Sequence, residues 1–154
     1  MNLNLFFTPT DILLPAHADM RRWSVIACDQ FTADAGYWQA VQDTVGDAPS
    51  TLRLMLPEFY LGKCDEAAAT REIQQTMRRY LDDGVFRTVP HSLVLVQRTL
   101  PGGAVRCGVV GALDLEAYDY APDSVTPIRA TEGTVASRLP ARVRIRAAAA
   151  LELP

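Results

Sequence analysis

"CDEAAATREIQQTMRRYLDDGVF", residues 64–86, is the stretch that decides the fold. Its apolar residues recur at the spacing of one helical face, namely Ile73, Met77, Tyr80 and Leu81. Its charged residues fall on the other faces. Gly84 follows the last of them, and glycine is the residue that most often ends a helix. The pattern therefore predicts an amphipathic helix over residues 65–83.

Downstream of this helix, two apolar runs rich in β-branched residues cover residues 92–99 and 105–114. The turn Pro-Gly-Gly, residues 101–103, separates them. Such a turn is too short for a parallel crossover, so the two runs are predicted to pair as an antiparallel hairpin. A loop with two prolines follows the hairpin, and Pro140 is placed to begin a short helix near the C-terminus.

Upstream of residue 64, the pattern predicts three more elements. Residues 32–49 are predicted to contain a helix that Thr32 or Asp34 caps and that Gly46 ends. "WSVIACD", residues 23–29, is a continuous apolar run with β-branched residues and predicts a buried strand. The alternating leucines of residues 50–61 predict another strand or extended segment.

Together these elements predict the α+β (mixed α/β) class, with a mostly antiparallel sheet, a β-hairpin and two or three flanking helices. The 154 residues have the length of one domain and contain no linker or internal repeat, so residues 1–154 are expected to form a single domain. The sequence closes on the apolar Leu151 and Leu153. We therefore expect it to be the N-terminal part of a longer protein, a fragment in which these two leucines lie on an exposed or poorly covered edge.

The composition excludes several classes of protein. A formal net charge of -3 argues against general nucleic-acid binding, which needs a broadly basic face. The three cysteines have neither the number nor the spacing of a disulfide framework or a zinc site, so no metal is expected. No apolar run reaches the roughly 20 residues that span a bilayer, and the first residues lack the pattern of a secretory signal. We expect a cytoplasmic protein without a membrane partner.

Residues 126–146 gather five arginines around a single acid, Glu132. A guanidinium presents a planar fork of donors that matches a phosphate or a carboxylate. The phosphate-binding residues that we predict here are Arg129, Thr131, Gly133, Thr134, Arg138 and Arg142. Glu132 is the predicted catalytic residue, because it could orient an arginine, bind Mg²⁺ or act as a base.

A simpler interpretation of the same arginines stays open. Of the 15 basic residues only Lys63 is a lysine, and an Ala-rich run, residues 147–150, lies nearby, as a GC-rich genome would favour. The arginines would then form a solvated basic helix that pairs with acidic residues elsewhere. Arg144 stands two residues from both neighbouring arginines, so helical geometry turns it by about 200° away from them.

Cys28, Asp29 and Gln30 stand at the end of the predicted strand over residues 23–29. Ligand groups collect at the carboxyl ends of strands in α/β sheets, so Asp29 and Gln30 are secondary candidates for a site. Cys28 could act as a nucleophile only with a paired base, and neither histidine stands in a matching motif. We therefore interpret Cys28 as a buried and inert cysteine.

Six phrases together resemble the domain of unknown function 1015 family. They are "VIACDQFT" (25–32), "YWQAVQDTVGDAPSTLRLMLPE" (37–58), "YLDDGVFR" (80–87), "GVVGALDLEAYDY" (108–120), "IRATEGTVASRLPARVRIR" (128–146) and "LELP" (151–154). The resemblance runs almost from end to end. Members of the family are substantially longer, and their later half looks like it carries a motif similar to one in the ParB/sulfiredoxin-like superfamily. This sequence does not contain that motif.

The resemblance implies a function in one of two classes. Members of that superfamily bind nucleotides and include free-serine kinases, which implies a phosphotransferase that uses a nucleotide with Mg²⁺ and a small phosphorylated molecule. The alternative is a regulatory or nucleic-acid-associated, ParB-like interaction module without catalysis. That module would need a basic surface wider than one pocket, which the net charge of -3 disfavours.

Overall fold

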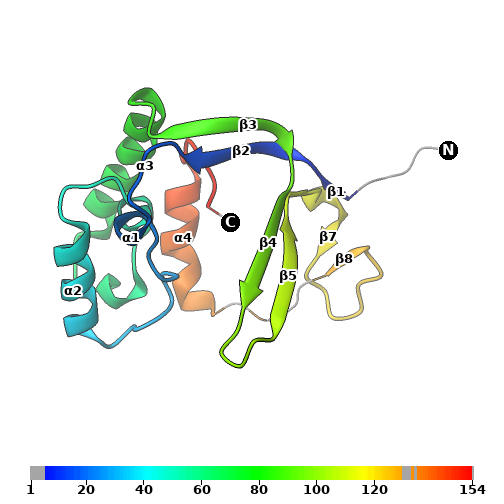
Figure 1. Cartoon of the computed structure of the whole chain (residues 1–154). Helices are drawn as coiled ribbons and strands as arrows, with labels where there is room; N and C mark the ends of the chain where they lie inside the picture. Colours follow the sequence, from blue (N-terminus) through cyan, green and yellow to red (C-terminus); the bar gives the residue numbers. More distant parts are fainter. Residues whose placement is uncertain (1–5, 130–132, 134, 154) are drawn as a thin grey trace. The chain divides into compact units, whose positions relative to one another are not determined.

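The computed structural model describes residues 6–129, 133 and 135–153. Figure 1 shows their helices and strands, coloured along the sequence from blue at the N-terminus to red at the C-terminus. The helices are α1 (Met20–Trp23), α2 (Ala35–Val45), α3 (Glu66–Asp82) and α4 (Leu139–Arg146), and the short 3-10 helices are η1 (Thr51–Leu54), η2 (Glu58–Tyr60), η3 (Leu115–Ala117) and η4 (Ala136–Arg138). The strands are β1 (Phe7–Thr8), β2 (Thr10–Pro15), β3 (Phe86–Ser92), β4 (Val94–Thr99), β5 (Val105–Val110), β6 (Ala112–Leu113), β7 (Tyr118–Asp119) and β8 (Ile128–Arg129).

The chain forms two compact units. One contains residues 1–14, 88–133 and 154 and holds most of the strands, and the other contains residues 15–87 and 134–153 and holds α1 to α4. The strands form two-stranded pairs, β1 with β6, β2 with β3, β4 with β5 and β7 with β8. The first and third of these pairs are antiparallel, whereas β7 and β8 run parallel. The predicted α+β class is confirmed.

The helix predicted over residues 65–83 is confirmed as α3. The Asp65 carboxylate caps its first turn by accepting hydrogen bonds from the Ala67 and Ala68 backbone, both at 3.0 Å. At the other end Gly84 adopts φ +68°, and the Val85 N–H donates to the Tyr80 carbonyl at 3.0 Å. This 6→1 hydrogen bond is characteristic of a Schellman motif. The motif requires a residue in the left-handed region, which glycine adopts without steric strain.

The apolar face of α3 differs from the predicted face by one residue. Ile73, Met77 and Tyr80 are buried, but Leu81 is 38% exposed, and Thr70 and Thr76 are buried instead. At about 100° per residue, Leu81 lies about 80° from Ile73, outside the arc of about ±60° that the buried positions cover. Hydrophobicity alone placed Leu81 on the buried face. The angular position of a residue around the helix axis, however, decides whether its side chain faces the core.

The core of the helical unit is the buried cluster Trp23, Leu54, Ile73, Met77 and Tyr80. Full burial of such side chains stabilises by about 1.5–3 kcal/mol each. Helices α3 and α4 lie side by side in this unit (Figure 1), and the Gln74 amide donates to the carbonyls of Arg144 and Ile145 at the end of α4. Leu151 and Leu153 are half-buried against the cluster, so neither of the two is fully exposed.

The helix predicted within residues 32–49 is confirmed as α2. The Asp34 carboxylate accepts from the Tyr37 N–H at 2.9 Å, so Asp34 and not Thr32 is the cap. Trp38 is fully buried and donates its indole N–H to the Phe31 carbonyl at 3.0 Å. Gly46 is the C-terminal cap, as its position predicted.

Two predicted strands are wrong. Residues 23–29 begin at the last residue of α1 and then continue as irregular chain in which Ile26 is 38% exposed. The Trp23 carbonyl, which a strand partner would bind, accepts instead from the hydroxyls of Ser50 at 3.3 Å and Thr51 at 2.8 Å. The segment predicted as extended over residues 50–61 forms η1 and η2, because the Ser50 side chain accepts from the Leu52 N–H and starts a helical turn.

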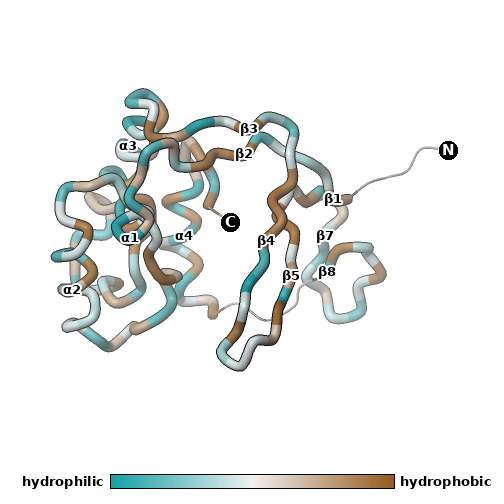
Figure 2. Tube along the Cα trace, in the orientation of Figure 1, coloured by the Kyte–Doolittle hydropathy of each residue, from teal (hydrophilic) through white to brown (hydrophobic). Residues whose placement is uncertain are grey.

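The hairpin is confirmed in the strand unit. Strands β4 and β5 pair antiparallel in the register Val94↔Val110 to Thr99↔Val105. Their turn closes with Leu100 N–H donating to the Ala104 carbonyl at 2.8 Å. Figure 2 shows β4 and β5 as hydrophobic in their part far from the turn, and part of β4 nearer the turn as hydrophilic. The short helix predicted from Pro140 is also confirmed, since Pro140 stands in the first turn of α4.

Candidate site around Glu58, Arg138 and Arg142

The predicted phosphate-binding residues do not all lie in one unit. Thr131, Glu132 and Thr134 lie outside the described residues. Arg129 ends β8 in the strand unit, where its Nε donates to the Thr126 carbonyl at 3.5 Å, and the exposed Gly133 belongs to the same unit. Arg138 and Arg142 belong to the helical unit, which brings these two predicted residues together.

The two arginines share a buried carboxylate, that of Glu58. Arg138 Nη1 lies 3.0 Å from Oε2, and Arg142 Nη2 donates to Oε1 at 2.9 Å. The Glu58 side chain is only 5% exposed, whereas those of Arg138 and Arg142 are 39% and 41% exposed. Oε2 lies within ion-pair distance of Arg138, but no hydrogen bond of good geometry reaches it from the described residues. The carboxylate is thus inside and the guanidiniums are at the surface.

Local structure explains how these three side chains meet. Glu58 opens η2 after Pro57, and its N–H donates to the Cys28 carbonyl at 2.8 Å, which fixes the turn. Arg138 ends η4, and Arg142 follows four residues later in α4. Residues four apart on a helix lie on the same face, so both guanidiniums reach the same carboxylate.

Burial raises the pKa of the Cys28 thiol, and the nearby carboxylates of Asp29 and Glu58 raise it further. The Arg142 guanidinium opposes them and lowers this pKa, but the net direction is upward. A thiol with a raised pKa carries little of the thiolate that a nucleophile needs. The geometry therefore agrees with an unreactive Cys28, although its residue is half-buried rather than buried.

Asp29 and Gln30 do not stand at the end of a strand, because residues 23–29 form none. Both are exposed, and the Gln30 amide donates to the Asp29 carboxylate at 3.1 Å. Neither touches the Glu58 carboxylate by a hydrogen bond. Among the described residues, no group of three or more His, Cys, Asp or Glu side chains is arranged to hold a metal ion.

The remaining arginines of α4 have other partners. Arg144 pairs with Glu66 of α3, and Arg146 pairs with Glu152 beyond the end of α4. Arg144 is thus directed to a different acid from Arg138 and Arg142. Arg138 and Arg142 combine two guanidiniums on one carboxylate, which leaves a local charge of about +1 and several donors facing solvent.

Sequence reasoning did not single out Glu58. Its partners stand 80 and 84 residues further along the chain, and no spacing rule connects positions that far apart. The related signal in the sequence is the excess of arginine over acid in residues 126–146, which indicates that acidic partners come from another part of the chain.

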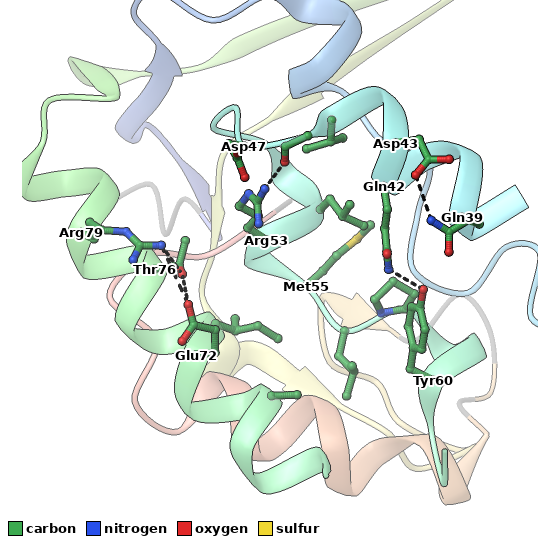
Figure 3. Close-up of a pocket in the computed structure, with 17 residues that line it drawn as sticks. Gln39, Gln42, Asp43, Asp47, Arg53, Met55, Tyr60, Glu72, Thr76 and Arg79 are labelled. Atoms are coloured by element: carbon green, nitrogen blue, oxygen red, sulfur yellow. Dashed lines mark hydrogen bonds and ion pairs between the residues drawn. The ribbon is translucent and has the colours of Figure 1, made fainter. Parts of the chain in front are cut away.

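A second feature of the helical unit is a groove of about 530 Å³ between α2, η1, η2 and α3 (Figure 3). Gln42 Nε2 donates to the Tyr60 hydroxyl at 2.7 Å across it. Pro57 and Tyr60 line this groove, whereas Glu58 between them binds the arginines.

The fold and the arginine–carboxylate site define an α+β protein whose surface presents paired guanidiniums. A family model described as "Protein of unknown function (DUF1015)" matches residues 9–154, and the chain belongs to that family. No curated protein and no solved structure gives a significant match. None of the helices in the described part of the chain has the length and apolar character needed to cross a membrane.

Proposed function

We propose that this protein binds a phosphorylated small molecule or a nucleotide through Arg138 and Arg142. The observation that carries the proposal is that one buried carboxylate holds both guanidiniums while about 40% of each side chain stays exposed. A fixed guanidinium loses less freedom when it binds a phosphate than a mobile one does. Glu58 therefore acts as a positioning residue for two anion-binding arginines.

The charges near the two arginines favour a small ligand over nucleic acid. Each of the four arginines from Arg138 to Arg146 has an acidic partner. A surface that reads a nucleic-acid backbone needs a stripe of available cations. Paired arginines with a local excess of about one charge suit a single phosphate group, and this disfavours the interaction-module alternative.

The finer proposal is phosphoryl transfer to a small molecule. Phosphoryl transfer rests mainly on positioning and charge neutralisation, to which arginines and Mg²⁺ contribute. Arg129, Thr131, Gly133 and Thr134 stay predicted phosphate-binding residues, and Glu132 stays the predicted base or Mg²⁺ ligand. What suggests this step is the likeness of longer family members to a superfamily that includes free-serine kinases, and Arg138 and Arg142 would provide its anchor.

Isothermal titration with inorganic phosphate, ATP and ADP, each with and without Mg²⁺, tests the proposal. Arg138→Ala should weaken the binding of the best ligand by about 10-fold to 100-fold, as expected for loss of charged hydrogen bonds. Arg138→Lys should recover only part of it, because lysine lacks the planar fork. Arg144→Ala is the matched control and should change the affinity by less than about 2-fold.

Glu58→Gln separates the proposal from the simpler interpretation. If Glu58 positions the arginines for an anion, Glu58→Gln should weaken phosphate binding a few-fold, because the released guanidiniums lose more freedom on binding. If the arginines serve only to neutralise Glu58, phosphate will not bind, and neither Arg138→Ala nor Glu58→Gln will change that. Equal effects of Arg138→Ala and Arg144→Ala would also contradict the proposal.

A further inference from the structure

The groove between α2, η1, η2 and α3 is a second cavity of ligand size, separate from the arginine site. Its volume of about 530 Å³ lies in the range of roughly 300–1,000 Å³ that small-molecule sites occupy. Every residue that lines it belongs to the helical unit. It is therefore formed by one compact body and by no contact between the two units.

The floor of the groove is apolar. Val45 and Ile73 are 2% and 5% exposed, and Leu52, Met55 and Leu56 are half-buried beside them. In Figure 3 the Met55 side chain extends between α2 and α3. Half-buried apolar side chains on a concave surface gain free energy when a ligand covers them, so the floor favours an apolar body.

Both arginines that line the groove are already engaged. Arg53 donates to the Gly46 carbonyl and to the Ala48 carbonyl, the latter at 3.3 Å, at the end of α2. Arg79 donates to the Thr76 hydroxyl at 3.0 Å and lies 3.9 Å from Glu72, so its side chain follows the surface of α3 (Figure 3). The positive charges are thus directed to the protein and not to a ligand.

The acids of the groove are more available. Asp47 has no hydrogen bond or ion pair with the described residues, and it is exposed at the end of α2. Asp43 accepts a single side-chain hydrogen bond, from Gln39 at 2.9 Å. Glu72 accepts a hydrogen bond from the Thr76 hydroxyl at 3.4 Å and makes a long ion pair with Arg79, and its side chain is 68% exposed. With three acids against two engaged arginines, the groove has an excess negative charge above an apolar floor.

We propose that this groove binds a small organic cation, a primary amine or guanidinium attached to an apolar body. The apolar body lies on Leu52, Leu56 and Ile73, and the cation lies near Asp47 and Glu72. This preference is opposite in charge to that of the arginine site, although η2 contributes to both, through Tyr60 to the groove and through Glu58 to the arginines. The groove therefore adds a second ligand specificity to the proposed anion binding and does not depend on it.

The test uses three probes with the same phenyl ring and closely similar chains: phenethylamine, 2-phenylethanol and 3-phenylpropionate. Methyl resonances of Leu52, Leu56 and Ile73 are followed by NMR during titration of the whole chain. We expect saturable shifts of these methyl groups with phenethylamine, an affinity about 3-fold to 5-fold lower for the alcohol, and no saturation with the carboxylate. Equal affinity for the three probes, or no shift of these methyl groups with the amine, would overturn the proposal.

Amide variants identify the carboxylates. Asp47→Asn and Glu72→Gln should each weaken phenethylamine by about 3-fold to 5-fold, the range of a partly exposed ion pair. Asp82→Asn is the matched control, because Asp82 ends α3 outside the groove, and it should have no effect. Arg142→Ala should also leave amine binding unchanged, which separates the result from the phosphate experiment. If Asp82→Asn weakens binding as much as Asp47→Asn does, the attraction is a general effect of net charge and the proposed site is wrong.

Discussion

The ion pairs of Glu58 should respond very differently to removal of the acid and removal of the bases. The carboxylate is 5% exposed and the two guanidiniums are 39% and 41% exposed. In the double variant Arg138→Ala/Arg142→Ala a buried carboxylate would lose both partners, which costs about 3–5 kcal/mol in free energy of unfolding. In Glu58→Gln the arginines can turn to water, so the cost should be only about 1 kcal/mol.

A triple variant shows whether the buried charge is the cause. When Glu58→Gln is added to the double variant, the group left inside is neutral, and we expect about 2–4 kcal/mol to be regained. Guanidinium denaturation is the assay, because the fluorescence of the buried Trp23 and Trp38 reports on the helical unit. Arg144→Ala, which breaks an exposed pair with Glu66, should change stability by less than about 0.5 kcal/mol.

Two outcomes would refute this reasoning. The first is that Glu58→Gln destabilises as much as the double arginine variant, which would mean that the neutral amide is as poorly accommodated as an unpaired charge. The second is that the triple variant is no more stable than the double variant. A loss of about 3–5 kcal/mol is a large fraction of the about 5–15 kcal/mol that stabilises a typical domain, so the differences are measurable.

Tyr80→Phe should lower the free energy of unfolding by about 1–3 kcal/mol, because it leaves the buried N–H of Ser50, now bonded to the Tyr80 hydroxyl at 3.0 Å, without an acceptor; urea denaturation measures it. Gly111→Ala should disrupt the pairing of β1 with β6, because an added Cβ would stand 2.8 Å from a backbone oxygen of β1. Amide hydrogen exchange in the two strands measures this, and exchange slower than in the wild type would contradict it. Alkylation of Cys28 by iodoacetamide at pH 8 should be slower in Arg142→Ala, because loss of the guanidinium raises the pKa of the thiol further and lowers the thiolate fraction; mass spectrometry follows the rate, and Arg144→Ala is the control.

The sequence by itself determined the elements whose signals are local. The cap Asp65, the apolar spacing and the left-handed Gly84 all lie within α3 or directly beside its ends, and each acts over only a few residues. The same holds for the hairpin, where two glycines at positive φ, Gly102 and Gly103, close the turn and fix the register. Such interactions do not depend on the rest of the fold, so they can be predicted from the chain.

Only the tertiary structure decided where the ambiguous apolar runs go. Residues 23–29 look like a strand, but their polar backbone groups meet the Ser50 and Thr51 hydroxyls, which stand more than 20 residues away. The candidate site was decided in the same way. The arginine cluster was visible in the sequence, yet its division into a pair on Glu58 and separate partners for Arg144 and Arg146 depends on which acids the packing of α3, η2 and α4 brings near. Long-range charge pairing depends on which side chains the fold buries and brings close together. No periodicity or motif in the sequence indicates either of these.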